Sequence, residues 1–168
     1  LIKGMLNKIR LGYHSSPICL NNLPTDCDRS LCPSGADDIR LNRTCQINEN
    51  DPFDIVPYAN ELAEKNIGDI LKVLEYNEQN NIRFMRISSD ICPHISNWRM
   101  IKDNLNFRAL AYNLEQFKSE LKKVGDFCKK YKHRITFHPK PYAVLNTPKP
   151  FTLITVMREL YWHARFFD

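Results

Sequence analysis

Apolar residues return every three or four positions in three long stretches, which predicts three amphipathic helices. These stretches are Tyr58–Asn80, Leu114–Tyr131 and Phe151–Phe167. The first stretch closes on Asn80 and Asn81, and asparagine tolerates the left-handed backbone conformation that commonly ends a helix.

Shorter runs between the helices have the period of β-strands. The runs Lys8–Tyr13, Ile82–Ser88 and Arg134–Phe137 place apolar side chains on one face and stop at polar or turn-forming residues. The segment His14–Pro57 has no sustained period and is rich in Pro, Asn, Asp, Cys and Ser. It predicts a long loop, and long ordered loops are commonly functional.

The alternation of strands and helices predicts an α/β protein with a parallel sheet. Three βα units are too few to close a barrel, which takes eight. As a complete domain, they would form only a thin flavodoxin-like sheet. The chain opens on Leu1 instead of Met, and Asp168 directly follows an apolar helical pattern without a stop signal. We therefore expect residues 1–168 to be the N-terminal portion of a single TIM (β/α)8-barrel domain.

Composition places the chain among globular proteins. Apolar residues make up 43% and charged residues 26% of the 168 positions. No apolar run approaches the roughly 20 residues of a membrane-spanning helix, and the opening residues lack the features of a signal peptide, so we expect an intracellular protein. A net charge of +5 mildly favours polyanionic partners. The six cysteines lack zinc-site spacing, which predicts reduced, packed thiols.

Functional side chains of such sheets gather at the carboxyl ends of the strands. Tyr13, Ser88–Asp90 and His138 should therefore converge at one edge. Pro139 cannot extend the ladder, so the preceding imidazole of His138 is aimed by a stiff backbone. This imidazole suits a metal ligand, a general base or a local hydrogen bond, and Asp90 suits an N-cap, an arginine partner or a ligand.

The other histidines and aromatic residues divide by context. His94 lies in the loop after the second strand, within reach of the same edge. His133, in the basic run KKYKHR, predicts solvated surface, and His163 predicts a packing role on the last helix. Tyr142 and Trp98, like the tyrosine of the first strand, are candidates to stack on bases or to wedge into a duplex.

Several blocks of sequence, taken in order, carry a resemblance. They are IRLGY (Ile9–Tyr13), LNRTC (Leu41–Cys45), NIGDILKVLEYNEQNNIRFMRISSD (Asn66–Asp90), FHPxxYxxLN (Phe137–Asn146) and ELYWHARFFD (Glu159–Asp168). Together they resemble the UV damage endonuclease family over most of the chain. The resemblance implies a TIM barrel that nicks double-stranded DNA immediately 5′ to UV photoproducts and other distorting lesions, by hydrolysis assisted by divalent metal ions, typically Mn2+.

The resemblance also implies roles for individual residues. His138 becomes a metal ligand, Tyr13 probes the lesion from the end of the first strand, and Tyr142 enters the duplex where damaged nucleotides flip out. The main catalytic groups and the other metal ligands are expected beyond Asp168. The residues implied in DNA or lesion binding are Tyr13, Asn42, Arg43, Lys140, Pro141, Tyr142 and Asn146, and those of a possible active-site loop are Ser89, Asp90, His94 and Asn97.

The sequence departs from the family pattern at two places, and the first weakens the expected damage selectivity. Lys140-Pro141 replaces the usual Gly-Gln, and proline has no side-chain hydrogen bond to offer the lesion. Asn97 stands where a histidine is usual, and His94, three residues earlier, is a candidate to compensate.

Two alternatives therefore remain open: a non-catalytic lesion-binding remnant of the family, and a sugar isomerase-like TIM barrel. Tyr13, Tyr142 and the block around Arg43 count against the second. For the nuclease we expect a monomer that acts on damaged double-stranded DNA, with no membrane partner and no nucleotide cofactor.

Overall fold

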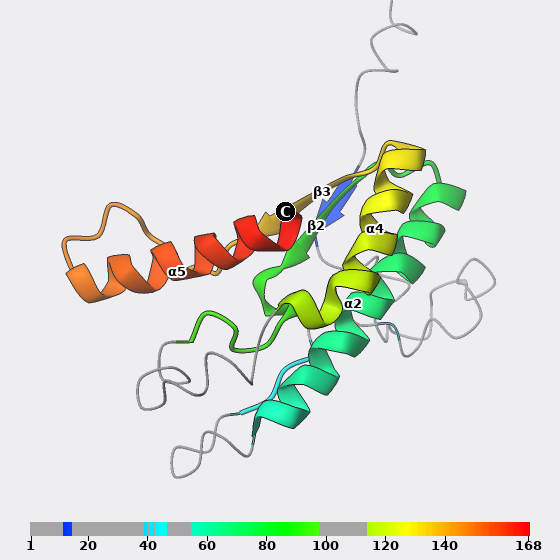
Figure 1. Ribbon diagram of the computed structural model, residues 1–168. Helices are drawn as coiled ribbons and strands as arrows, with labels where there is room; N and C mark the ends of the chain where they lie inside the picture. Colours follow the sequence, from blue (N-terminus) through cyan, green and yellow to red (C-terminus); the bar gives the residue numbers. More distant parts are fainter. Residues whose placement is uncertain (1–11, 15–38, 40, 42, 47–54, 98–113) are drawn as a thin grey trace, which may run out of the picture.

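The computed structural model describes residues 12–14, 39, 41, 43–46, 55–97 and 114–168. Its strands and long helices follow one another in the order β1, α2, β2, α4, β3, α5 (Figure 1). This is the order of three βα units, as the alternating periods predict. None of the helices in this part of the chain is long and apolar enough to cross a membrane.

The strands form one parallel sheet. They are β1 (Gly12–His14), β2 (Phe84–Ser88) and β3 (Arg134–His138), with β2 in the middle. The parallel sheet expected from the sequence is therefore confirmed. The third strand is one residue longer than predicted, because His138 still pairs with Ser88 before Pro139 ends the ladder.

Two helices cover one face of the sheet, where the core lies. Figure 1 shows α2 (Ile55–Gln79) and α4 (Lys118–Tyr131) side by side against the strands. Each fully buried aliphatic side chain contributes about 1.5–3 kcal/mol to folding. The fully buried core residues of α2 and β2 include Ile67, Ile70, Val73, Leu74, Met85 and Ile87.

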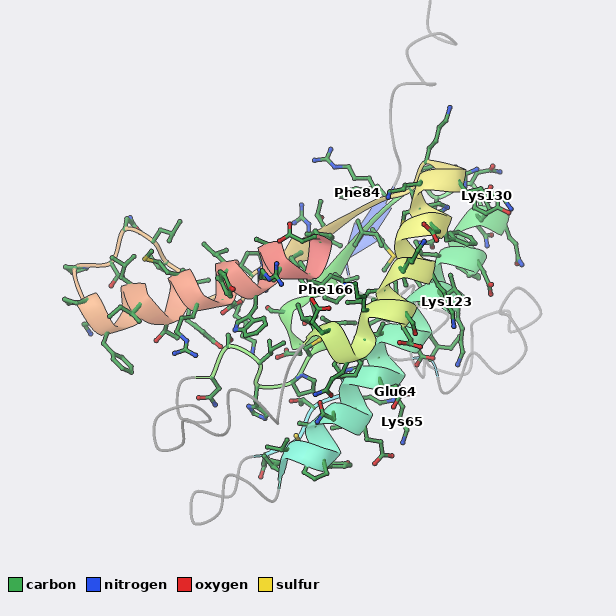
Figure 2. All side chains as sticks on the ribbon, in the orientation of Figure 1. Glu64, Lys65, Phe84, Lys123, Lys130 and Phe166 are labelled. Carbon is green, nitrogen blue, oxygen red and sulfur yellow. The ribbon has the colours of Figure 1, made fainter. Side chains whose placement is uncertain are left out.

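The last helix has a different environment. α5 (Pro150–Phe167) begins with proline at a position where its missing N–H costs nothing, and it extends to one side of the sheet in Figure 1. Figure 2 labels Phe166, near the end of α5, which packs against the core. Apolar side chains in the first half of α5, such as Ile154 and Met157, are exposed.

The predicted helix bounds shift slightly. α2 begins at Ile55, three residues before the predicted start, and its end bears out the expected left-handed cap because Asn81 has φ 58°. The second predicted helix opens with one 3-10 turn, η6 (Leu114–Phe117), before α4 begins.

Candidate functional site at the carboxyl ends of the strands

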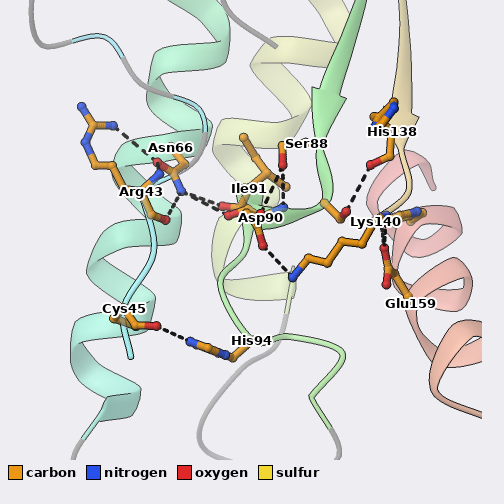
Figure 3. Close-up of polar contacts among 12 residues, drawn as sticks. Arg43, Cys45, Asn66, Ser88, Asp90, Ile91, His94, His138, Lys140 and Glu159 are labelled. Carbon is orange, nitrogen blue, oxygen red and sulfur yellow. Dashed lines mark hydrogen bonds and ion pairs between the residues drawn. The ribbon is translucent and has the colours of Figure 1, made fainter. Parts of the chain in front are cut away.

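The ends of β2 and β3 lie level with each other. Ser88 pairs with His138, and the hydroxyl of Ser89 donates a hydrogen bond to the carbonyl of His138 over 3.1 Å (Figure 3). Tyr13 pairs instead with Met85, three residues before the end of β2. At about 3.3 Å per residue, its backbone lies roughly 10 Å below that of Ser88 along the strand direction. The sheet thus joins the serines to His138, whereas Tyr13 stands deeper in the ladder.

A cross-link joins the segments that follow β2 and β3. Lys140 Nζ lies 2.7 Å from Asp90 Oδ1, and both side chains are about one-third exposed. Burial alone would lower the pKa of the Lys140 ammonium, but the hydrogen bond and charge of Asp90 outweigh it and raise the pKa above its ordinary value. The ammonium expected to meet a phosphate is therefore paired with a carboxylate of the same edge.

The contacts of Asp90 bear on two of the three alternatives left by the sequence, the N-cap and the arginine partner. Its backbone N–H donates to Ser88 Oγ over 3.2 Å, so Ser88 is the N-cap of the 3-10 turn η4 (Ser89–Ile91). The carboxylate of Asp90 is the partner of a cation, which is Lys140 rather than an arginine.

The segment that carries Arg43 is fastened to α2 by a buried amide. Asn66 is fully buried; its Oδ1 accepts the backbone N–H of Arg43 at 3.1 Å, and its Nδ2 donates to the carbonyls of Arg43 at 3.0 Å and Ile91 at 3.2 Å. The Arg43 guanidinium donates to Asp69 Oδ2 at 2.7 Å, and only 15% of this side chain is exposed. In this arrangement Arg43 binds Asp69 of α2, and its guanidinium is not exposed for contact with a phosphate.

His94 fastens the same segment from its other end. Its Nε2 lies 2.6 Å from the carbonyl oxygen of Cys45 (Figure 3), and its own carbonyl accepts the backbone N–H of Asn97 at 2.8 Å. His94 has φ 62°, a conformation uncommon for residues other than glycine. One ring nitrogen of His94 is thus engaged by the backbone, and Asn97 lies half-buried beside it.

The loop after β3 exposes the side chain of Tyr142 to solvent. Tyr142 is 56% exposed, and Pro141 and Asn146 are exposed as well. The N–H of Ala143 donates to the carbonyl of Lys140 at 2.9 Å, which closes a tight turn around Pro141 and Tyr142. Asn42 and Trp98 lie outside the described residues.

Candidate metal ligands do not cluster in the described part of the chain. No group of three or more His, Cys, Asp or Glu side chains there is placed to hold an ion. His138 ends its strand at the expected edge, but the described residues alone do not make a divalent-metal site. Of the metal ligands that the resemblance implies, the described residues therefore contain one, the imidazole of His138, and no complete set.

The cysteines in the described residues are packed thiols, as expected. Cys45, Cys92 and Cys128 are free. Burial raises the pKa of the Cys92 thiol to about 12 and that of Cys128 to about 11. Both stay protonated near neutral pH, which makes them poor nucleophiles and poor metal ligands. Cys19, Cys27 and Cys32 lie outside the described residues.

The prediction that His133 is solvated surface is wrong. Only 1% of its side chain is exposed, and its Nε2 lies 2.9 Å from Glu78 Oε2. Arg83 also donates to Glu78, so the three side chains form one cluster at the amino ends of β2 and β3. The prediction rested on the basic residues around His133, but the His133 side chain, directly before β3, points into the protein.

Several polar residues that organise the site were missed. Asn66 and Asp69 fall on the same helical stripe as the apolar Leu62 and Val73, and a polar residue in an apolar stripe is a signal for a buried hydrogen bond. Glu159 on α5 is buried too, and accepts the backbone N–H of Lys140 at 3.0 Å. His163 stacks on Phe137 with ring centroids 4.2 Å apart, in line with its expected packing role.

The fold places the protein in the class of parallel α/β proteins, in which ligands commonly bind at the carboxyl ends of the strands. Within this class, the chain matches the family described as UV-endonuclease UvdE over residues 9–168, and it belongs to that family.

Sequence identity to known proteins points to the same family. The chain is 31% identical to the UV-damage endonuclease of Schizosaccharomyces pombe over 157 residues, which cover 92% of this chain and 22% of that relative. It is 35% identical to the UV DNA damage endonuclease of Clostridium perfringens over 107 residues, 64% of this chain and 24% of the relative. The chain thus spans about a quarter of the length of these relatives.

A solved structure supports the fold. The structure titled "Crystal Structure of SacUVDE" superposes with a TM-score of 0.66 at 24% sequence identity, over 95% of this chain and 45% of that one. The three βα units are consistent with part of a barrel of that kind.

Proposed function

We propose that the protein is a DNA repair endonuclease that nicks double-stranded DNA immediately 5′ to UV photoproducts and other distorting lesions. Family membership supports the nuclease class. Family membership also makes a sugar isomerase-like activity a weaker alternative than the nuclease. The proposal includes the complete architecture, in which these residues are the first three βα units of a (β/α)8 barrel acting as a monomer without a nucleotide cofactor.

The observation that carries the proposal is the arrangement of His138 and Tyr142 at one edge of the sheet. β3 ends at His138 because Pro139 cannot continue it, and four residues later the ring of Tyr142 is more than half exposed. An exposed aromatic ring beside the strand ends is suited to stack on bases or to separate them. A lesion already weakens base stacking, so a site of this kind selects DNA that is easy to distort.

His138 is the proposed metal ligand of this edge. Neutral imidazole is a common ligand for divalent transition metals such as manganese. Because the described residues form no group of three candidate ligands, the other ligands in this proposal come from elsewhere in the protein. A bound divalent ion supplies Lewis-acid activation of water and of the phosphodiester.

The experiment that tests the nuclease is nicking of UV-irradiated supercoiled plasmid, with manganese and with chelator, beside unirradiated plasmid. We expect metal-dependent open circles from irradiated DNA, and His138→Ala should reduce the rate on the order of a hundredfold or more, as the loss of a ligand would. Lys123→Ala, on the exposed face of α4 in Figure 2, is the control and should nick normally. Equal nicking of both plasmids, or normal nicking by His138→Ala, would contradict the proposal.

A second candidate is a non-catalytic protein that binds lesions. Its motivation is the lack of a complete ligand group in the described residues, together with Pro141 and Asn97 at positions where the resemblance implies a glutamine and a histidine. It predicts a preference for irradiated over intact duplex that chelator does not remove, and no nicking. Equal affinity for the two duplexes would rule out this candidate.

A further inference from the structure

The backbone after β3 has an unusual shortage of hydrogen-bond donors. Pro139 and Pro141 have no N–H, so Lys140 carries the sole backbone donor between His138 and Tyr142. The ladder with β2 ends at His138, and no further strand residue receives this donor. The acceptor of this one N–H group is therefore one of the contacts that set the direction of the turn.

That acceptor is the carboxyl group of Glu159, one side chain of α5. The N–H of Lys140 donates to Glu159 Oε1 at 3.0 Å (Figure 3), and only 3% of Glu159 is exposed. A buried carboxyl group costs stability unless it is hydrogen-bonded, so its position under the turn is explained by this bond.

His163 lies near Glu159 on α5 and packs against β3. His163, one helical turn further along α5, has its Nε2 3.9 Å from Glu159 Oε1. The ring of His163 stacks on Phe137, the residue before His138, with an angle of 4° between the ring planes. α5 thus contacts the end of β3 through a stacked ring and a hydrogen-bonded carboxyl group, on either side of His138 in sequence.

Besides the Ala143–Lys140 hydrogen bond within the turn, two contacts reach it from the segment after β2. Ser89 donates to the carbonyl of His138, and Asp90 pairs with the ammonium of Lys140. Glu159 provides the backbone tie from α5. We propose that Glu159 is a positioning residue, which fixes the turn so that His138 and Tyr142 project in the directions the site requires. This inference rests on the proposed function.

The test compares two substitutions of nearly equal shape. Glu159→Gln keeps an oxygen that can accept the Lys140 N–H, whereas Glu159→Met fills the same space without an acceptor. Met157→Ala, at an exposed position of α5, is the control. In the full chain labelled with 15N-lysine, amide hydrogen exchange of Lys140 reports the bond directly. We expect exchange to quicken about tenfold in Glu159→Met, the loss of one hydrogen bond, and to change little in Glu159→Gln or Met157→Ala.

The functional readouts are affinity for irradiated duplex and the nicking rate with manganese. A misplaced turn should weaken both in Glu159→Met, by up to about a hundredfold in nicking, with recovery in Glu159→Gln. Fast Lys140 exchange in the unsubstituted chain overturns the inference, as does a Glu159→Met protein with faster exchange and unchanged DNA binding and nicking. If Glu159→Met does not fold, a folded Glu159→Gln protein that fails to bind irradiated duplex overturns it.

The two proposals fail in different ways. An unsubstituted chain that neither prefers nor nicks irradiated DNA contradicts the proposed function, and the functional half of this inference falls with it. The exchange of the Lys140 amide still decides whether Glu159 holds the turn.

Discussion

Arg43 shows how strongly its neighbours can define the role of a cationic side chain. Its guanidinium faces Asp69, which is 5% exposed, while Lys72 reaches the other oxygen of the same carboxylate from a side chain that is 60% exposed. A phosphate contact would require the guanidinium to leave a nearly buried partner. Removing one member of a buried charge pair costs stability because the burial of the remaining charge is then less fully compensated. The geometry favours a structural role for Arg43.

Arg43→Met should therefore destabilise the fold by about 1–3 kcal/mol, because Asp69 loses its buried partner. Lys72→Met removes the same charge from an exposed position and should cost no more than about 0.5 kcal/mol. Urea unfolding followed by circular dichroism measures both. If Arg43 instead contacts phosphate, its loss would lower the salt dependence of DNA binding by about one unit of slope and leave stability unchanged.

At the scale of an element, the residue that ends α4 has an unfavourable backbone conformation that a substitution can relieve. Lys132 caps this helix in the left-handed conformation, with φ 60° and ψ 36°, and its N–H donates to the carbonyl of Cys128. Glycine is the residue for which this conformation has no steric cost, and α2 solves the same problem with Asn81 at φ 58°.

Lys132→Gly should stabilise the protein by about 0.5–1 kcal/mol, since relief of the left-handed strain exceeds the added freedom of the unfolded chain. Lys123→Gly removes an equal charge from the middle of α4 and should destabilise by about 1 kcal/mol. Thermal unfolding of the two variants at equal ionic strength gives the comparison. A lower melting temperature for Lys132→Gly would show that the lysine side chain contributes more than its backbone costs.

Periodicity predicted the elements well and the polar contacts between them poorly. The helices and the parallel strands follow from apolar spacing, which local sequence records directly. By contrast, Asn66 on α2 contacts Arg43 and Ile91 in two other segments, and Glu159 on α5 contacts Lys140 in the turn after β3. Their roles depend on how distant segments are placed. Tyr13 illustrates the same limit, because strand register is a property of the assembled sheet.

Across the whole molecule, the two ends of the sheet differ in their chemistry. The carboxyl end carries His138, with Tyr142 exposed close by. The amino end carries the cluster of Glu78, Arg83 and His133, which joins the end of α2 to the starts of β2 and β3. Partly buried polar clusters of this kind help to specify how elements pack, and this one lies away from the candidate site.

The amino-end cluster should make stability depend on pH. Partial desolvation raises the pKa of Glu78, but hydrogen bonds from His133 and Arg83 outweigh it and hold the pKa below the ordinary value of 4.5. A lowered pKa in the folded state means that Glu78 stabilises the fold above that ordinary value, and that this contribution is lost as pH falls through the folded pKa.

Melting temperatures measured from neutral pH down past the ordinary carboxyl range test this expectation. Glu78→Gln should lower the melting temperature at neutral pH and flatten its fall in acid. Glu61→Gln, which breaks an exposed pair with Lys65, should leave the profile nearly unchanged. Parallel profiles for Glu78→Gln and the unsubstituted protein would contradict the assignment.

The short first strand also has a consequence for the order in which the molecule assembles. Gly12 pairs with Phe84, so joining β1 to the sheet closes a loop that contains the whole of α2, and among the described residues it gains a ladder of three residues. β2 and β3 pair along five residues each. The entropy lost in closing a long loop must be recovered from the contacts that it brings. β1 should accordingly be the last strand to join as the chain folds and the first to leave as it unfolds.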